Sequence, residues 1–165
     1  MSLLSDELRA RIGETRVYVA PEPLSRAAIR YYAQAVGDDN PLYTDTAAAL
    51  AAGLPDVVAP PTLLCDTNQY CAGTPDADGF AGHSWGIEVP GTRTVRGGND
   101  YRFFRYARPD DVVTVEWRLA DIAEVVNSSG SAMLIVTSEA LVTDQHGEQI
   151  LRNTETIIHV AVASA

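Results

Sequence analysis

The chain has 165 residues, of which 46% are hydrophobic and 21% charged, a composition that suits one domain with a buried core. Its 22 acidic and 12 basic residues give a net charge of −10, which argues against a nucleic-acid-binding protein because phosphate contacts need a basic face. All 12 basic residues are arginine. The absence of lysine excludes Schiff-base chemistry, pyridoxal phosphate anchoring and a phosphate-binding-loop lysine on this chain.

The N-terminal segment and the cysteines indicate the compartment. Residues 1–13 are amphipathic without the apolar run of a signal peptide, and no segment approaches the roughly 18 apolar residues of a membrane span. Cys65 and Cys71 lie in one apolar stretch. In a helix they would be about 9 Å apart, beyond disulfide reach. We interpret them as reduced thiols, with a reactive cysteine as the alternative, and expect a soluble cytoplasmic protein with no membrane contact.

The first half of the chain is predicted to be helical. Ser25 is an expected N-cap, apolar residues recur at helical spacing over 29–36, and Gly37 ends that helix. A short helix is expected over 46–52. A buried helix is expected over 62–72, with Pro60 and Pro61 at its start and a glycine at its end.

The second half is predicted to form strands. Residues 74–91 are rich in Gly, Pro and Asp and predict a long loop. Apolar and polar residues then alternate over 113–119 and 134–142, and a last strand is expected over 156–162. Turn sequences at 127–130 and 145–148 separate consecutive strands, as in antiparallel hairpins. This order predicts an α+β domain in which a helix packs on a curved antiparallel sheet.

Residues 37–43, Gly-Asp-Asp-Asn-Pro-Leu-Tyr, are the most informative segment. The helix that ends at Gly37 places the Asp38 carboxylate at a tight turn, with the Asn40 amide beside it. An aspartate held in this way can act as a general base toward water where bulk solvent is excluded. Asp and Asn are also common turn residues, so a purely structural role is the alternative.

This segment resembles the motif Gly-Asp-x-Asn-Pro-Leu-His of the MaoC-like, R-specific enoyl-CoA hydratases. Residues 57–62, 97–104 and 108–111 follow the family's order as well, the last resembling its "RPGD" turn. The resemblance covers about residues 14–162 of a single domain spanning 1–165. It implies a hot-dog fold, in which an antiparallel sheet wraps a long central helix, usually assembled into homodimers or heterodimers.

The departure from the family motif is Tyr43, which occupies the histidine position. The resemblance implies hydration of an enoyl thioester, or dehydration of a 3-hydroxyacyl thioester, with Asp38 as general base and Asn40 holding it or the substrate. A tyrosine, with its ordinary pKa near 10, would serve as a hydrogen-bond donor there. The alternatives are a non-catalytic subunit that completes a hetero-oligomer with a His-bearing partner, and thioester hydrolysis with Asp38 as base.

Two further groups are candidates for binding substrate. Backbone N–H groups at the start of the 62–72 helix could polarise a thioester carbonyl, and because Pro61 has none the donors would be Thr62 and Leu63. Strand parity places Arg96 and Arg102 on one face, where they could bind the phosphates of coenzyme A or of a carrier's phosphopantetheine. Solvated arginines are the alternative. We expect no other cofactor and no metal.

The three histidines are expected to be surface or strand-face residues. His146 falls in a predicted turn and His159 in the last strand. His83 belongs to the long loop, which could close over a site.

Overall fold

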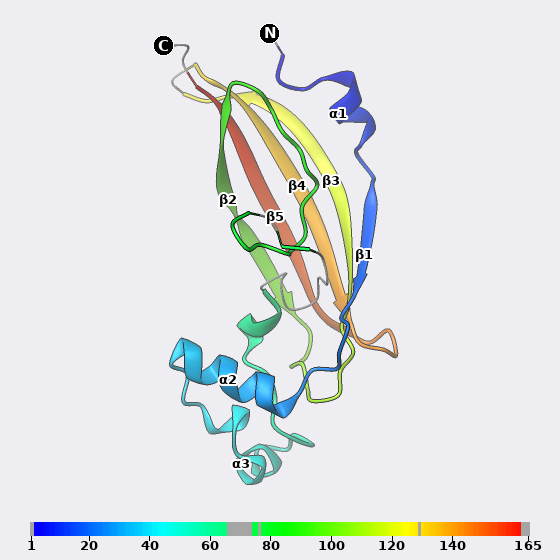
Figure 1. Ribbon diagram of the computed structural model, residues 1–165, viewed down its shortest axis with the longest axis vertical. Helices are drawn as coiled ribbons and strands as arrows, with labels where there is room; N and C mark the ends of the chain where they lie inside the picture. The colour runs from blue at the N-terminus through cyan, green and yellow to red at the C-terminus, as the bar shows by residue number, and fades with distance from the viewer. Residues whose placement is uncertain (1, 66–73, 76, 129, 163–165) are drawn as a thin grey trace.

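The computed structural model describes residues 2–65, 74–75, 77–128 and 130–162. Its main element is a curved, five-stranded antiparallel sheet, which confirms the expected α+β class (Figure 1). The strand order is β1-β3-β4-β5-β2, so β1 and β2 form the two edges. The strands are β1 (Thr15–Val19), β2 (Thr92–Phe103), β3 (Thr114–Val126), β4 (Ala132–Thr143) and β5 (Gln149–Ala161).

The described helices are short, and α2 is capped as the sequence predicts. They are α1 (Asp6–Ala10), α2 (Arg26–Val36) and α3 (Thr46–Ala51), with 3₁₀ turns at Pro41–Tyr43 and Pro61–Cys65. Ser25 accepts a hydrogen bond from the Ala28 N–H at 3.0 Å, and Gly37 closes α2 with a left-handed φ of 71°. The helices expected over 29–36 and 46–52 are therefore confirmed as α2 and α3, whereas α1 was not predicted.

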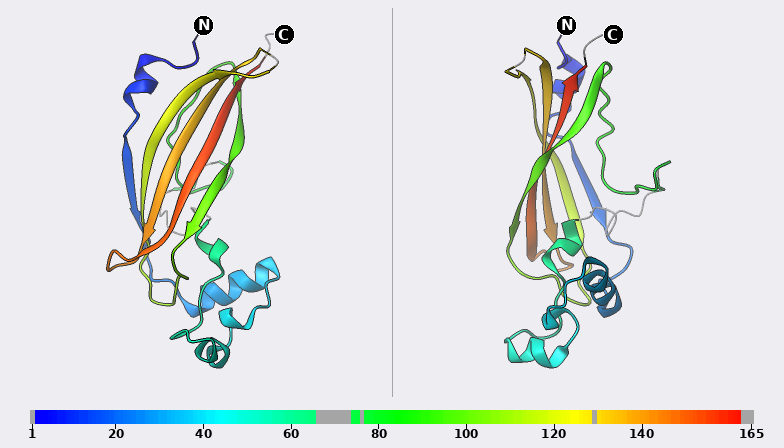
Figure 2. Two further views of the ribbon diagram at one scale, coloured as in Figure 1. Left: turned by 180° about the vertical axis from the view of Figure 1, so that it is seen from behind. Right: turned by 90° about the vertical axis from the view of Figure 1, so that its left-hand side faces the viewer.

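The helix expected over 62–72 is described only at its start. Its first residues form the 3₁₀ turn Pro61–Cys65, and the remainder, with Cys71, lies outside the described residues. Helices α2 and α3 lie beyond one end of the sheet and do not cover its face (Figures 1 and 2). Part of the 74–91 loop packs on the sheet, because His83 stacks on Trp117 of β3 with ring centroids 4.5 Å apart.

The core follows the strand periodicity. Alternate residues of β3 and β4 are buried, including Val115, Trp117 and Leu119 on the first and Leu134 and Val136 on the second. Two strands differ from expectation. β5 begins well before residue 156, and β1 was not predicted because it is a short edge strand with four of its five residues exposed, so it lacks an alternating pattern.

A β-bulge in β2 changes which residues face inward. The register with β5 shifts between Arg96 and Gly98. A Cβ at Gly97 would lie 2.9 Å from Thr156 Cγ2, so this position of the bulge requires glycine. An extra residue reverses the side-chain parity beyond it. The expectation that Arg96 and Arg102 share a face is therefore wrong.

The turn at 108–111 contains a strained residue. Asp110 has a φ of 70°, the left-handed conformation that glycine adopts without steric cost. The side chain of Asp110 is exposed, so its replacement removes no packing. We expect Asp110→Gly to raise the free energy of unfolding by roughly 0.5–1 kcal/mol, measured by urea denaturation. A decrease in stability would show that the carboxylate contributes more than the strain costs.

Within the described residues, no helix has both the length and the apolar character needed to cross a bilayer.

Candidate active site and acyl cavity

The turn that carries Asp38 lies between α2 and α3. Asp38 is exposed, and its Oδ1 accepts a hydrogen bond from the Asn40 N–H at 3.2 Å. Asn40 caps the following 3₁₀ turn, because its Oδ1 accepts from the Leu42 N–H at 3.1 Å. The side chains of Asp38 and Asn40 thus stabilise the local backbone, which is the purely structural role given above as the alternative. In the isolated chain the Asp38 carboxylate is exposed to solvent.

Tyr43 is buried, with only 6% of its surface exposed. Burial raises the pKa of its phenol, the Asp38 carboxylate and Tyr106 raise it further, and a hydrogen bond from the Asn40 side chain opposes them. The phenol therefore keeps its proton at neutral pH. It can donate a hydrogen bond, but it cannot accept a proton as an imidazole would.

The 3₁₀ turn Pro61–Cys65 offers little to a thioester oxygen. Pro61 has no N–H, and the Leu63 N–H donates to the Pro60 carbonyl at 2.9 Å. The Leu63 side chain is buried in the core. Of the three residues expected to bind the thioester, Thr62 remains the candidate. It is exposed, and its backbone N–H is the potential donor to the thioester oxygen.

Beside this turn lies an apolar cavity of about 270 Å³. Pro61 and Leu64 line one side, and residues at the end of β2 and the start of β5 line the other. The Val58 N–H donates to the Leu42 carbonyl of the motif turn at 3.0 Å, and the next residue, Ala59, donates to the carbonyl of Ala107, which lines the cavity. The 58–60 segment therefore links the motif turn to this cavity.

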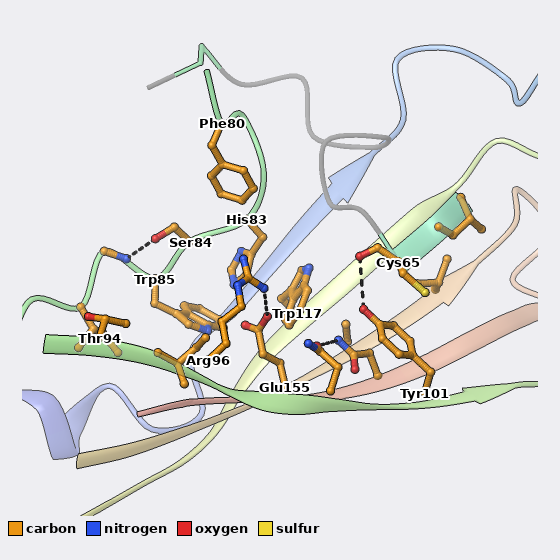
Figure 3. A pocket seen from close by; sticks show the side chains of 18 of the residues that line it. Cys65, Phe80, His83, Ser84, Trp85, Thr94, Arg96, Tyr101, Trp117 and Glu155 are labelled. Atoms are coloured by element: carbon orange, nitrogen blue, oxygen red, sulfur yellow. Dashed lines mark hydrogen bonds and ion pairs between the residues drawn. The ribbon is translucent and has the colours of Figure 1, made fainter. Parts of the chain in front are cut away.

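A larger cavity of about 390 Å³ lies on the inner face of the sheet (Figure 3). Leu64 and Leu151 line both cavities, so the two adjoin. The 74–91 loop contributes aromatic residues to the larger one, and four strands contribute its floor. The side chains that line the larger cavity include Cys65, His83, Trp85, Tyr101, Trp117 and Glu155.

Polar groups are distributed along this inner face. Arg96 pairs with Glu155 at 3.7 Å, and the Tyr101 hydroxyl donates to the Cys65 carbonyl at 3.3 Å (Figure 3). Burial raises the pKa of the Glu155 carboxyl, which Arg96 partly offsets, and burial also raises the pKa of the Tyr101 phenol. The cavity is thus a site with aromatic walls and a partly polar floor, the usual character of a small-molecule pocket.

The two candidate phosphate-binding arginines lie apart. Arg96 lines the large cavity, whereas Arg102 lies over the ring of Phe104 at 5.2 Å. Arg105, which follows shortly after Arg102 in the sequence, binds Asp111 and Asp144 within the protein at 2.8 Å each. Arg96, Arg102 and Arg105 therefore do not converge on one anion.

Sequence reasoning missed most of the cavity residues, among them Trp117, Asn153 and Glu155. Trp117 belonged to a predicted strand but was assigned to the core. Asn153 and Glu155 precede the predicted start of the last strand at 156. Together with Leu151 and Ile157 they occupy every second position of β5 and line the cavity, and this period-2 spacing was the available signal.

Among the described residues, no three His, Cys, Asp or Glu side chains gather as a metal site.

The family model for the FAS1-like dehydratase domain region matches residues 11–153. The chain belongs to this family. It also belongs with the UPF0336 proteins: that of Thermobifida fusca is 34% identical over 145 residues, which cover 87% of this chain and 88% of the relative.

Two solved structures show the same fold. A chain of the ChsH1-ChsH2 complex from Mycobacterium tuberculosis aligns with a TM-score of 0.71 at 20% identity, over 96% of this chain and 90% of that one. The MaoC-like dehydratase from Rhodospirillum rubrum aligns with a TM-score of 0.65 at 20% identity, over 93% and 94%. The hot-dog fold and the MaoC-like resemblance are confirmed. The roles of individual residues stay predictions.

Proposed function

We propose that this chain is the acyl-thioester-binding subunit of a hot-dog hydratase or dehydratase, and that a second, His-bearing hot-dog subunit supplies the acid–base pair. Membership of a dehydratase family supports the reaction class. The main observation in favour of placing binding and catalysis on different subunits is Tyr43, a buried phenol with a raised pKa at the histidine position of the motif.

The chemistry of hydration explains why Tyr43 matters. Adding water to an enoyl thioester needs one group that takes a proton from water and one that delivers a proton to the α-carbon. Loss of one such group costs about 10²–10⁴ in rate. Asp38 is exposed and accepts a hydrogen bond from the Asn40 N–H, so the described part of the chain does not shield its carboxylate from bulk water, as a general base toward a bound water requires.

The two adjoining cavities support the binding role. The acyl group would enter past Tyr106 into the apolar cavity, with the thioester oxygen near the Thr62 N–H, and extend past Leu64 and Leu151 toward the larger cavity. The apolar walls favour this by removing hydrocarbon surface from water. The carrier, coenzyme A or a phosphopantetheine arm, would remain outside.

A partner subunit is supported by the similarity to a chain taken from a complex of two proteins, ChsH1 and ChsH2. An exposed edge strand, β2, is available for pairing with a second sheet, and apolar residues at its end are partly exposed: Phe103, Phe104 and Tyr106.

The proposal is tested by steady-state hydration of short, long and ring-bearing trans-2-enoyl-CoA esters. We expect turnover by the purified chain to stay at least 10²-fold below that of a hydratase with the complete pair. Asp38→Asn, and Asp39→Asn as the matched control at the neighbouring exposed carboxylate, should leave this residual rate unchanged. Efficient turnover that Asp38→Asn abolishes and Asp39→Asn preserves would overturn the proposal and establish Asp38 as the base of a self-sufficient enzyme.

A further inference from the structure

The wall of the large cavity that lies opposite the strands is held in place by side chains from the N-terminal part of the chain. This wall consists of residues 83–87, here called the strap (Figure 3). The Arg16 guanidinium donates to the Ser84 carbonyl at 2.8 Å and lies 5.4 Å from the centre of the Trp85 ring. Arg11 donates to the Trp85 carbonyl at 2.9 Å. Two arginines thus bind consecutive carbonyl groups of the strap.

Tyr18 makes a third contact with the strap. Its hydroxyl is hydrogen-bonded to His83 Nδ1 at 3.0 Å, and the two rings pack edge to face. We call Arg11, Arg16 and Tyr18 the latch. Arg16 and Tyr18 belong to the edge strand β1, and Arg11 precedes it. The latch side chains do not line the cavity, so they are positioning residues that act on it through the strap.

On its inner side the strap docks on the sheet through two buried rings. His83 stacks on Trp117 of β3 with an interplanar angle of 14°, and the Trp85 indole donates to the Ser138 hydroxyl of β4 at 2.9 Å. The docked strap therefore covers part of the cavity floor, including Trp117, which is 2% exposed.

The strap lacks the backbone hydrogen bonds that hold a strand in a sheet. Within the described part of the chain, residues 84–87 make no backbone–backbone hydrogen bond, and the Gly86 N–H donates to the Ser84 hydroxyl inside the strap. Gly79 and Gly91, with left-handed φ values of 82° and 74°, lie on either side of it. A segment held mainly by side chains can open locally while the sheet remains folded.

We propose that the strap opens away from the sheet to give ligands access to the large cavity, and that the latch sets how often it opens. Opening breaks the latch contacts and undocks His83 and Trp85, but it breaks no pairing between strands. The cavity is therefore gated from β1, an element that does not line it.

Hydrogen exchange of the Trp85 indole N–H measures opening without a ligand. The chain has two tryptophans, so its proton–nitrogen NMR spectrum has two indole signals, and the one lost in Trp85→Phe belongs to Trp85. We expect this N–H to be at least about tenfold less protected from exchange than the best-protected amides of β4, after correction for intrinsic rates. Equal protection would mean that the strap opens only when the whole domain unfolds, and would overturn the proposal.

Substitutions in the latch test its role. Arg16→Gln removes a charge-assisted hydrogen bond and a ring contact, so it should accelerate exchange of the Trp85 indole about three- to tenfold. Tyr18→Phe removes only the hydroxyl and should accelerate it about two- to fivefold. Arg118→Gln is the matched control, because Arg118 also lies beside β1 but pairs with Glu139 on the exposed face, and it should change nothing. An indole rate that both latch variants leave unchanged would overturn the latch.

Ligand access is measured by stopped-flow tryptophan fluorescence with decanoyl-CoA, a saturated thioester that cannot be hydrated; this arm rests on the proposed function. If the strap opens for both entry and exit, Arg16→Gln should raise the association and dissociation rate constants by the same factor, about three- to tenfold, with Kd nearly unchanged. Faster dissociation alone would show a fixed wall and overturn the gate. If decanoyl-CoA does not bind the parent chain, the acyl-binding function fails, whereas exchange of the Trp85 indole still decides whether the strap opens.

Discussion

Arg105→Ala is expected to lower the free energy of unfolding by about 3–5 kcal/mol, because it leaves buried carboxylates without a counter-charge. The guanidinium binds Asp111 and Asp144 at 2.8 Å each, and both aspartates are 5% exposed. The same aspartates order two turns: Asp111 accepts from the Arg108 N–H, and Asp144 accepts from two N–H groups of the β4–β5 turn. Urea denaturation followed by far-ultraviolet circular dichroism measures the loss.

The matched control is Arg118→Ala. Arg118 pairs with Glu139 at 3.6 Å on the exposed face of the sheet, where about half of each side chain contacts solvent. Exposed pairs of this kind contribute little, so stability should change by less than about 0.5 kcal/mol. Equal losses in the two variants would contradict the view that Arg105 is held at the centre of a buried network.

The second large effect is a loss of stability in mild acid, caused by His83. Burial, and to a smaller extent the charge of Arg16, lowers the pKa of this imidazole from 6.5 to about 4. The unfolded chain therefore binds a proton that the folded chain does not. Stability should fall as pH drops from 6.5 to about 4, by up to about 1.4 kcal/mol per pH unit, and should level off once both states are protonated.

Urea denaturation at a series of pH values, compared with His83→Gln, isolates this contribution. The variant should be less stable at neutral pH, because Tyr18 loses its contact with the imidazole, but should lose less stability on acidification. His159, whose pKa burial also lowers, contributes equally to both proteins. His146→Gln, in the exposed β4–β5 turn, should follow the parent curve. A parent and His83→Gln with parallel pH profiles would show that His83 titrates normally.

The strands and caps could be predicted because their signals are local. Ser25 and Gly37 bound α2 as expected, and the alternation around Trp117 gave β3 the correct inward face. The bulge at Gly97 could not be predicted, since it depends on how β2 meets Thr156 of β5. That single extra residue moved Arg102 to the opposite face from Arg96.

The candidate site likewise has a part that could be predicted from local sequence and a part that could not. Local motif chemistry located the turn of Asp38, Asn40 and Tyr43, and these residues lie together. The burial of Tyr43 was not visible in the motif, because it comes from packing of distant segments. His83 and Trp85 belong to a sequence typical of an exposed loop, yet both are buried on the sheet. Tertiary contacts, not loop composition, determine that placement.

The central claim, acyl-thioester binding without independent catalysis, is tested most directly by mixing the purified chain in excess with one long trans-2-enoyl-CoA. Tryptophan fluorescence and enoyl-thioester absorbance are followed in the same sample. The account predicts prompt fluorescence quenching, since both tryptophans line the cavity, while the absorbance stays constant over many minutes. Loss of the enoyl absorbance in the parent but not in Asp38→Asn would contradict it, and so would the absence of any quenching.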